Sequence, residues 1–162
     1  MARLADLAQS SAQMLRSSGE TLAVAESSTG GLISAALLAV PGASAYYRGG
    51  SVIYTLEARR ALLGISRKDV SGLEPLTEAM AARFAQVARR QLDATWAIVE
   101  LGVAGPTRAR YGHAPGVSVL AVDGPRPRTA LIETGSDDRE GNMWRFTEAA
   151  LALLARALRE HG

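Results

Sequence analysis

Thr21-Leu-Ala-Val-Ala-Glu-Ser-Ser-Thr-Gly-Gly-Leu32 joins a short apolar run to a second apolar segment that continues to residue 40. The run 21–25 has the length and composition of a buried strand, and 32–40 is expected to form a helix. Residues 26–31 are the loop between them. A buried strand that leads into a helix through a short loop is typical of an α/β domain.

The remainder of the chain continues this alternation. We expect helices at 3–17, 57–63, 75–92 and 138–160, and strands at 50–55, 95–101, 116–123 and 129–134. A Gly-Pro-Arg-Pro turn separates the last two strands, which indicates an antiparallel pair. The order predicts one domain over residues 1–162, a three-layer α/β/α sandwich around a mixed, mostly parallel sheet.

Composition excludes several classes of site. The chain has 162 residues, of which 48% are hydrophobic and 21% are charged, so it is long and apolar enough to bury a core. It has no cysteine, which excludes disulfides, thiolate metal sites and cysteine nucleophiles. His113 and His161 are its two histidines, too few for a histidine-rich metal site. We therefore expect neither a metal ion nor a cofactor.

The charged residues are balanced in number but not in type. Seventeen arginines and a single lysine, Lys68, stand against 16 acidic residues and leave a formal charge of +2. Because these charges are scattered, we expect no nucleic-acid partner. The N-terminus has no signal-peptide pattern, and no apolar stretch is long enough to cross a bilayer. A cytoplasmic protein without a membrane partner is the expectation.

The loop 26–31 is the first candidate site, because ligands of α/β sheets bind at the carboxyl ends of strands. It offers three hydroxyl side chains and two glycines: Ser27, Ser28, Thr29, Gly30 and Gly31. Glycines allow a close backbone approach, and a following helix N-terminus favours an anion. The alternative is a helix cap whose glycines serve packing.

Other candidates follow neighbouring strands. The small residues of 102–106 leave room for a ligand, although an ordinary turn has the same composition. Tyr54 ends a predicted strand and Arg59 follows in the next helix, so the pair could position or activate a nucleophile. Arg139 opens the last helix and could reach a phosphate. The alternative is that Tyr54 is a half-buried aromatic side chain and that Arg59 and Arg139 are solvated charges.

Several of these segments together resemble a known family. Residues 25–31 are similar to the A-E-S-x-T-G-G signature of the CinA C-terminal domain family, which includes bacterial nicotinamide-nucleotide amidases. Further matches follow in the family's order: 40–45 (V-P-G-S-S-A), 49–59 (G-G-x-V-x-Y-S-N-E-A-K), 62–65 (L-L-G-V), 102–106 (G-I-A-G-P) and 135–139 (G-D-R). The resemblance covers nearly the whole chain.

The resemblance implies an activity and a set of residues. The family's amidases hydrolyse the carboxamide of nicotinamide mononucleotide (NMN) to nicotinic acid mononucleotide and ammonia, using a serine nucleophile, a lysine base and a tyrosine. Here Ser27 matches the serine, Tyr54 matches the tyrosine and Arg59 stands at the lysine position. The remaining candidates, for binding substrate, are Glu26, Thr29, Gly30, Gly31, Gly102, Ala104, Gly105 and Arg139. We expect a homodimer.

Arginine in place of lysine changes the chemistry that the site can perform. With a pKa above about 12, a guanidinium does not act as a base, so Arg59 should not deprotonate Ser27. It could still stabilise an oxyanion or hold Tyr54. Two hypotheses stay open: an amidohydrolase in which Tyr54, steered by Arg59, moves the proton, and a catalytically silent homologue that binds a nucleotide or a protein partner.

Overall fold

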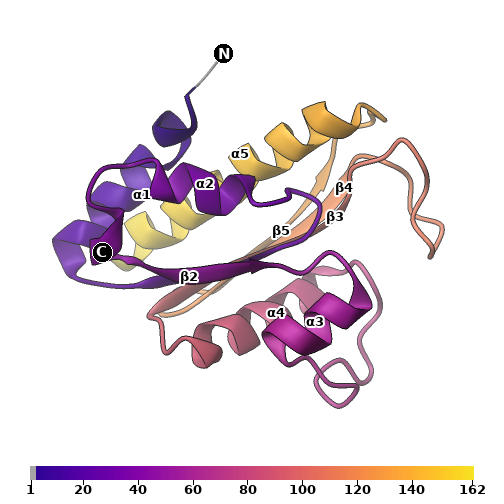
Figure 1. Cartoon of the computed structure of the whole chain (residues 1–162), viewed down its shortest axis with the longest axis horizontal. Helices are drawn as coiled ribbons and strands as arrows, with labels where there is room; N and C mark the ends of the chain where they lie inside the picture. The colour runs from indigo at the N-terminus through magenta and orange to yellow at the C-terminus, as the bar shows by residue number, and fades with distance from the viewer. Residues whose placement is uncertain (1–2) are drawn as a thin grey trace.

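The computed structural model describes residues 3–162 and places a five-stranded sheet between two layers of helices (Figure 1). The strands are β1 (Leu22–Glu26), β2 (Tyr47–Val52), β3 (Trp96–Val103), β4 (Val117–Asp123) and β5 (Arg128–Glu133). The helices are α1 (Leu4–Ser18), α2 (Leu32–Leu38), α3 (Leu56–Leu63), α4 (Glu78–Gln91) and α5 (Arg139–His161), and a short 3₁₀ turn spans Ala43–Ala45. The predicted three-layer fold and the predicted order of its elements are confirmed.

The sheet is mixed, with the strand order β2-β1-β3-β4-β5. β1 lies between β2 and β3 and runs parallel to both. β4 is antiparallel to β3 and to β5, as expected for the 116–134 hairpin. Four of the five strands therefore point the same way, and β4 is the exception, which agrees with a mostly parallel sheet.

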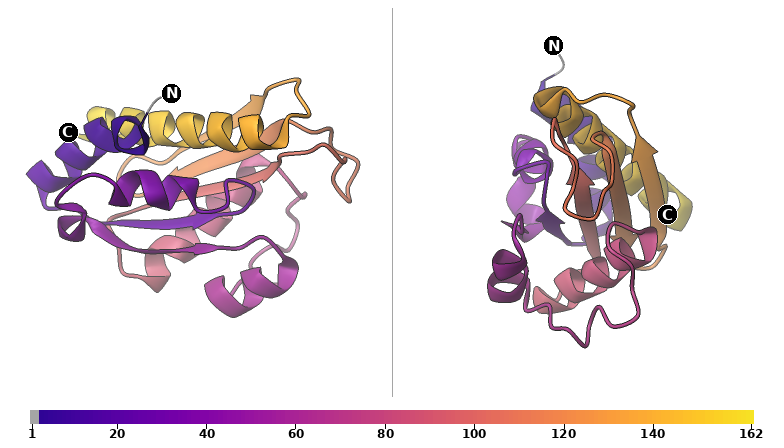
Figure 2. Two further views of the ribbon diagram at one scale, coloured as in Figure 1. Left: turned by 45° about the horizontal axis from the view of Figure 1, so that its top comes forward. Right: turned by 90° about the vertical axis from the view of Figure 1, so that its right-hand side faces the viewer.

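Each face of the sheet has its own hydrophobic core. Figures 1 and 2 show α1, α2 and α5 over one face and α3 and α4 over the other. Side chains of a strand alternate between faces, and β1 follows this rule. Leu22 and Val24 join the core with α1, α2 and α5, whereas Ala23 and Ala25 join the core with α4. Of the helices described here, none combines the length and apolarity needed to cross a bilayer.

Two elements, β2 and α4, begin three residues away from their predicted starts. β2 covers 47–52 instead of 50–55, because its register against β1 pairs Val52 with Glu26, the last residue of β1. Tyr54 therefore lies in the loop after the strand and not at its end. α4 begins at Glu78 because the Thr77 hydroxyl accepts the backbone N–H of Met80, which leaves Pro75 in the preceding loop.

The carboxyl ends of β1, β2 and β3 meet at one edge of the sheet, and the N-terminus of α5 reaches the same edge (Figure 1). Asn142 in the first turns of α5 holds two loops together there. Its Nδ2 donates to the carbonyl oxygens of Ala104 (2.8 Å) and Ser136 (2.9 Å), and its Oδ1 accepts from the Thr134 hydroxyl (2.7 Å). Asn142 is buried, so these bonds fix the loop that follows β3.

Replacing Asn142 with alanine should destabilise the protein by about 2–3 kcal/mol, because buried carbonyl groups of Ala104 and Ser136 lose their donor. Urea unfolding of both proteins measures the difference. Glu148→Ala, an exposed change on the same helix, is the control. An effect of Asn142→Ala as small as that of Glu148→Ala would contradict this role.

Candidate functional site

The Glu26 side chain builds the loop that follows β1. It is fully buried, and its Oε1 accepts from the Thr29 hydroxyl (2.7 Å) and from the backbone N–H groups of Gly31 (2.9 Å) and Ile33 (3.1 Å). Its Oε2 accepts the N–H of Ser34 (3.0 Å). A carboxylate at a helix N-terminus satisfies N–H groups that have no partner within the helix. Both Glu26 oxygens are thus engaged by the protein, and Glu26 positions the loop.

A second buried carboxylate, Glu100 of β3, holds the same loop from the neighbouring strand. Its Oε2 accepts the backbone N–H groups of Ser27 (3.0 Å) and Thr29 (3.1 Å) and approaches the Thr29 hydroxyl. Its Oε1 accepts a short hydrogen bond from the Ser28 hydroxyl and a longer one from Ser118 (3.3 Å). Sequence reasoning missed Glu100. An acidic residue within an otherwise apolar strand was the available signal.

Burial is the main influence on the protonation of Glu100. It raises the pKa of this carboxyl above the ordinary value for glutamic acid, while hydrogen bonds from Ser28, Thr29 and Ser27 act in the opposite direction. The result is a group that holds its proton to a higher pH than a solvated glutamate does.

Of the three hydroxyls in the loop, only that of Ser27 is left free. Ser28 and Thr29 donate to the two glutamates, whereas the Ser27 hydroxyl makes no hydrogen bond with residues 3–162. The backbone of Ser27 continues the pairing of β1, since its N–H donates to the Glu100 carbonyl oxygen (3.0 Å) as well as to Oε2. Ser27 therefore presents an uncommitted hydroxyl on a rigid backbone.

The N–H groups at the start of α2, which were expected to bind an anion, are occupied by protein acceptors. The N–H groups of Thr29 and Gly31 donate to Glu100 and Glu26, and the N–H of Gly30 donates to the Ser27 carbonyl oxygen. Gly30 and Gly31 have φ values of +64° and +104°, so glycine is needed for the turn itself. The loop is held by internal carboxylates where a ligand phosphate was expected.

The glycines after β3 make room for the same network. A Cβ added at Gly102 would lie 2.6 Å from the Ser28 hydroxyl and 2.7 Å from Glu100 Oε1. Gly105 has a φ of +101°, and a Cβ there would lie 2.9 Å from Pro115. Close packing thus explains the small residues at these two positions.

Tyr54 pairs with Arg139, not with Arg59. Arg139 Nη2 donates to Tyr54 Oη over 3.0 Å, and its Nη1 donates to the Gly105 carbonyl oxygen over 2.5 Å. The predicted Tyr54–Arg59 pair makes no hydrogen bond within residues 3–162, and Arg139 takes the place of Arg59 as the partner of Tyr54. One guanidinium instead connects the loops after β2 and β3, and Tyr54 itself is 57% exposed.

Arg59 lies in a different environment from the solvated one that a surface helix suggests. Its guanidinium carbon is 5.3 Å from the ring centroid of Phe84, and its Nε is buried without a hydrogen-bond partner among residues 3–162. Burial lowers the pKa of Arg59, while the charges of Tyr111 and Glu100 act to raise it. A guanidinium remains protonated here, so Arg59 cannot serve as a base.

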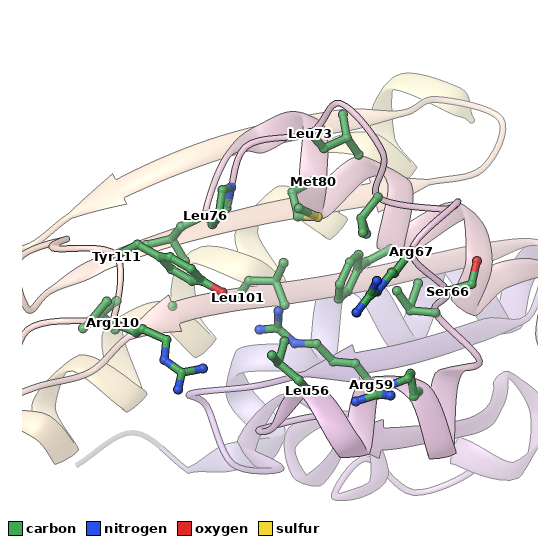
Figure 3. A pocket seen from close by; sticks show the side chains of 18 residues that line it. Leu56, Arg59, Ser66, Arg67, Leu73, Leu76, Met80, Leu101, Arg110 and Tyr111 are labelled. Atoms are coloured by element: carbon green, nitrogen blue, oxygen red, sulfur yellow. The ribbon is translucent and has the colours of Figure 1, made fainter.

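Arg59 also lines a cavity of about 470 Å³ between α3, α4 and the loop after β3 (Figure 3). Gly102 contributes to its wall, but Ser27, Tyr54 and Arg139 do not. The predicted site residues thus gather at one edge of the sheet in three places: the glutamate-held loop, the Tyr54–Arg139 pair and the Arg59 cavity. No group of three or more acidic or histidine side chains in residues 3–162 could hold a metal ion.

The family model and the most similar relatives found by comparison with known proteins indicate the same family. The family model described as "CinA C-terminal domain" matches residues 4–158. A CinA-like protein from Gloeobacter violaceus is 36% identical over 155 residues, which cover 94% of this chain and 36% of that protein. A CinA-like protein from Chlorobium phaeovibrioides is 35% identical over 156 residues, with 92% and 36% coverage. The chain thus spans about a third of the length of these curated relatives.

Solved structures match the chain over nearly its full length. A CinA superfamily protein from Klebsiella pneumoniae superposes with a TM-score of 0.88 and 26% identity, covering 98% of this chain and 99% of that one. A CinA superfamily protein from Escherichia coli gives a TM-score of 0.85 and 27% identity, with 94% and 88% coverage. The layers and sheet described above are therefore those of the CinA structures.

The raised pKa of Glu100 predicts a pH-dependent difference between the protein and Glu100→Gln. The folded protein keeps the Glu100 proton in a pH range where the unfolded chain has lost it, so stability falls as pH rises through that range. The limiting slope is about 1.4 kcal/mol per pH unit, and the glutamine variant lacks it.

Urea unfolding of both proteins at a series of pH values from acid to neutral measures the effect. The variant should gain stability relative to the parent as pH rises. Other titrating groups are common to the two proteins and cancel. Parallel pH profiles would show that Glu100 has the same pKa in both states.

Proposed function

Since this chain belongs to the CinA C-terminal domain family, we propose that it is an amidohydrolase of the nicotinamide-nucleotide type. Its substrate would be the carboxamide of NMN, and its products nicotinic acid mononucleotide and ammonia. The observation that carries the proposal is the free hydroxyl of Ser27 on a loop whose other two hydroxyls donate to buried glutamates. A nucleophile needs a hydroxyl that is held in place by its backbone and not bound by a competing acceptor.

Ser27 would attack the carboxamide carbon and form a tetrahedral intermediate, from which ammonia leaves. The acyl-serine ester that remains is then hydrolysed by water, which regenerates Ser27. The loops after β1 and β2 are joined at their start, because the N–H of Ile53 donates to the Glu26 carbonyl oxygen (2.8 Å). In this proposal Tyr54, on the second loop, would pass the serine proton to the leaving nitrogen.

Arg139 supports that role of Tyr54. Its guanidinium donates to the phenolic oxygen and is itself held by the Gly105 carbonyl oxygen, so it would stabilise negative charge on Tyr54 during proton transfer. Because Arg139 is largely exposed, it can also meet a substrate phosphate. Arg59 would contribute positive charge to the neighbouring cavity and no proton transfer.

A second function deserves a test because of Arg59. No lysine or histidine replaces the family's base among the residues assigned to the site, and a guanidinium cannot take its place. The alternative is therefore a catalytically silent CinA homologue that binds a nucleotide or a protein partner. In that case the glutamate-held loop has a structural role alone.

Ammonia release from NMN distinguishes the two functions. The purified protein should release ammonia, Ser27→Ala should lose activity by on the order of 10³-fold, and Tyr54→Phe by about 10²-fold. Ser17→Ala, an exposed serine of α1, is the matched control and should leave the rate unchanged. Arg59→Lys should raise the rate, because lysine can act as a base.

Each result of the ammonia-release assay leads to a different conclusion. An inactive parent that becomes active in Arg59→Lys would mean that the chain is a silent homologue with an intact framework. Inactivity of the parent and of Arg59→Lys would discard the amidase function. Activity that survives Ser27→Ala would remove Ser27 as the nucleophile.

A further inference from the structure

β2 forms one edge of the sheet, and no strand of residues 3–162 pairs with its outer side. The N–H of Ile53 points back to Glu26 of β1, and successive residues of a strand alternate in direction. The main-chain N–H and C=O groups of Gly50 and Val52 therefore point outward and find no partner within the described chain. Residues 49–52 carry no charge and no proline, two features by which proteins protect an edge.

Apolar side chains flank this edge on both faces of the sheet, where Figure 1 shows α2 and α3 on opposite sides of β2. Leu62 of α3 is exposed and lines, together with residues 49–51, a hollow of about 330 Å³ beside the strand. On the other face, Ser34 of α2 lies over Gly50, because a Cβ at Gly50 would be 2.9 Å from the serine hydroxyl. Leu38 follows one helical turn later on the same face of α2 and is exposed as well.

Opposite charges stand at the two ends of β2. Arg48 is exposed near the start of the strand, and Glu57 is exposed in the first turn of α3, which follows the strand. Neither side chain forms a salt bridge within residues 3–162, and the Arg48 guanidinium makes one long hydrogen bond there, to the Leu92 carbonyl oxygen (3.4 Å). A two-fold, antiparallel pair of such strands brings each charge to its opposite on the other copy.

We infer that β2 pairs antiparallel with β2 of a second copy of this chain, so that two five-stranded sheets join into one. A two-fold axis at Ser51 would let Gly50 of each copy exchange main-chain hydrogen bonds with Val52 of the other. Arg48 of one copy would then lie opposite the other copy's entry into α3, where Glu57 stands. The inference goes beyond the proposed amide hydrolysis and does not depend on it.

The helices beside the strand take part in this interface. Stable interfaces bury about 1,200–2,000 Å² in total, more than a short strand ladder supplies by itself. Leu38 and Leu62 would add apolar area on the two faces of the joined sheet, and the hollow beside Leu62 would receive an apolar side chain of the partner. At the opposite edge of the sheet, Arg128 of β5 is already paired with Glu160, so that edge lacks the free cation.

The oligomeric state of the full chain tests this inference. Sedimentation equilibrium at a series of micromolar concentrations should show a dimer that dissociates on dilution. Leu62→Glu puts a charge into the interface and should raise the dissociation constant about tenfold or more. Val52→Pro removes an outward N–H and no hydrogen bond to β1, so it should weaken the dimer as well. Leu131→Glu changes a similarly exposed leucine on β5 and is the matched control, with no expected effect.

A charge exchange tests the antiparallel arrangement. Arg48→Glu or Glu57→Arg alone places like charges together twice in each dimer, so either change should raise the dissociation constant about tenfold. The double variant recreates both ion pairs with their signs exchanged and should recover the affinity of the parent protein. Thermal unfolding confirms that each variant folds.

Three results would overturn the inference: a monomer at every concentration, an unchanged dissociation constant in both Leu62→Glu and Val52→Pro, or equal weakening by Leu131→Glu. Failure of the double charge variant to recover affinity would overturn the antiparallel pairing. Absence of ammonia release from NMN together with an intact dimer would reject the proposed function and leave this interface standing.

Discussion

The structure of this site depends on two buried carboxylates that bind one loop from both sides. Glu26 ends β1 and satisfies the first turn of α2, whereas Glu100 reaches across from β3 to Ser27, Ser28 and Thr29. Burying a carboxylate is costly unless donors surround it, and here backbone N–H groups supply most of them. Because the two strands are parallel neighbours, the loop becomes as well anchored as the sheet.

This arrangement decides which groups remain for chemistry. The N–H groups that could have bound a phosphate are already used, and the hydroxyls of Ser28 and Thr29 are used as well. Of the three hydroxyls in the loop, that of Ser27 is the one left without a partner in residues 3–162. Arg139 links Tyr54 to the loop after β3, and Arg59 lines a cavity that Gly102 borders as well.

The sequence predicted the fold well because the fold depends on local patterns. Apolar runs such as 21–25, the hairpin turn and the helical spacing before and after them are readable without knowing any distant contact. The sequence did not reveal which side chains of the site contact each other. Tyr54 and Arg139 are 85 residues apart and Glu100 lies 73 residues from Ser27, so no local pattern reveals either contact. Glu26 was assigned to substrate although its position also suits a helix cap.

Native-state hydrogen exchange of the loop amides tests the claim that two carboxylates anchor this loop. The N–H groups of Thr29, Gly31, Ile33 and Ser34 should exchange as slowly as the central strands, because each donates to Glu100 or Glu26. N–H groups in a loop and in the first turn of a helix ordinarily have no partner and exchange fast. Fast exchange at these four amides in the free protein would contradict the account.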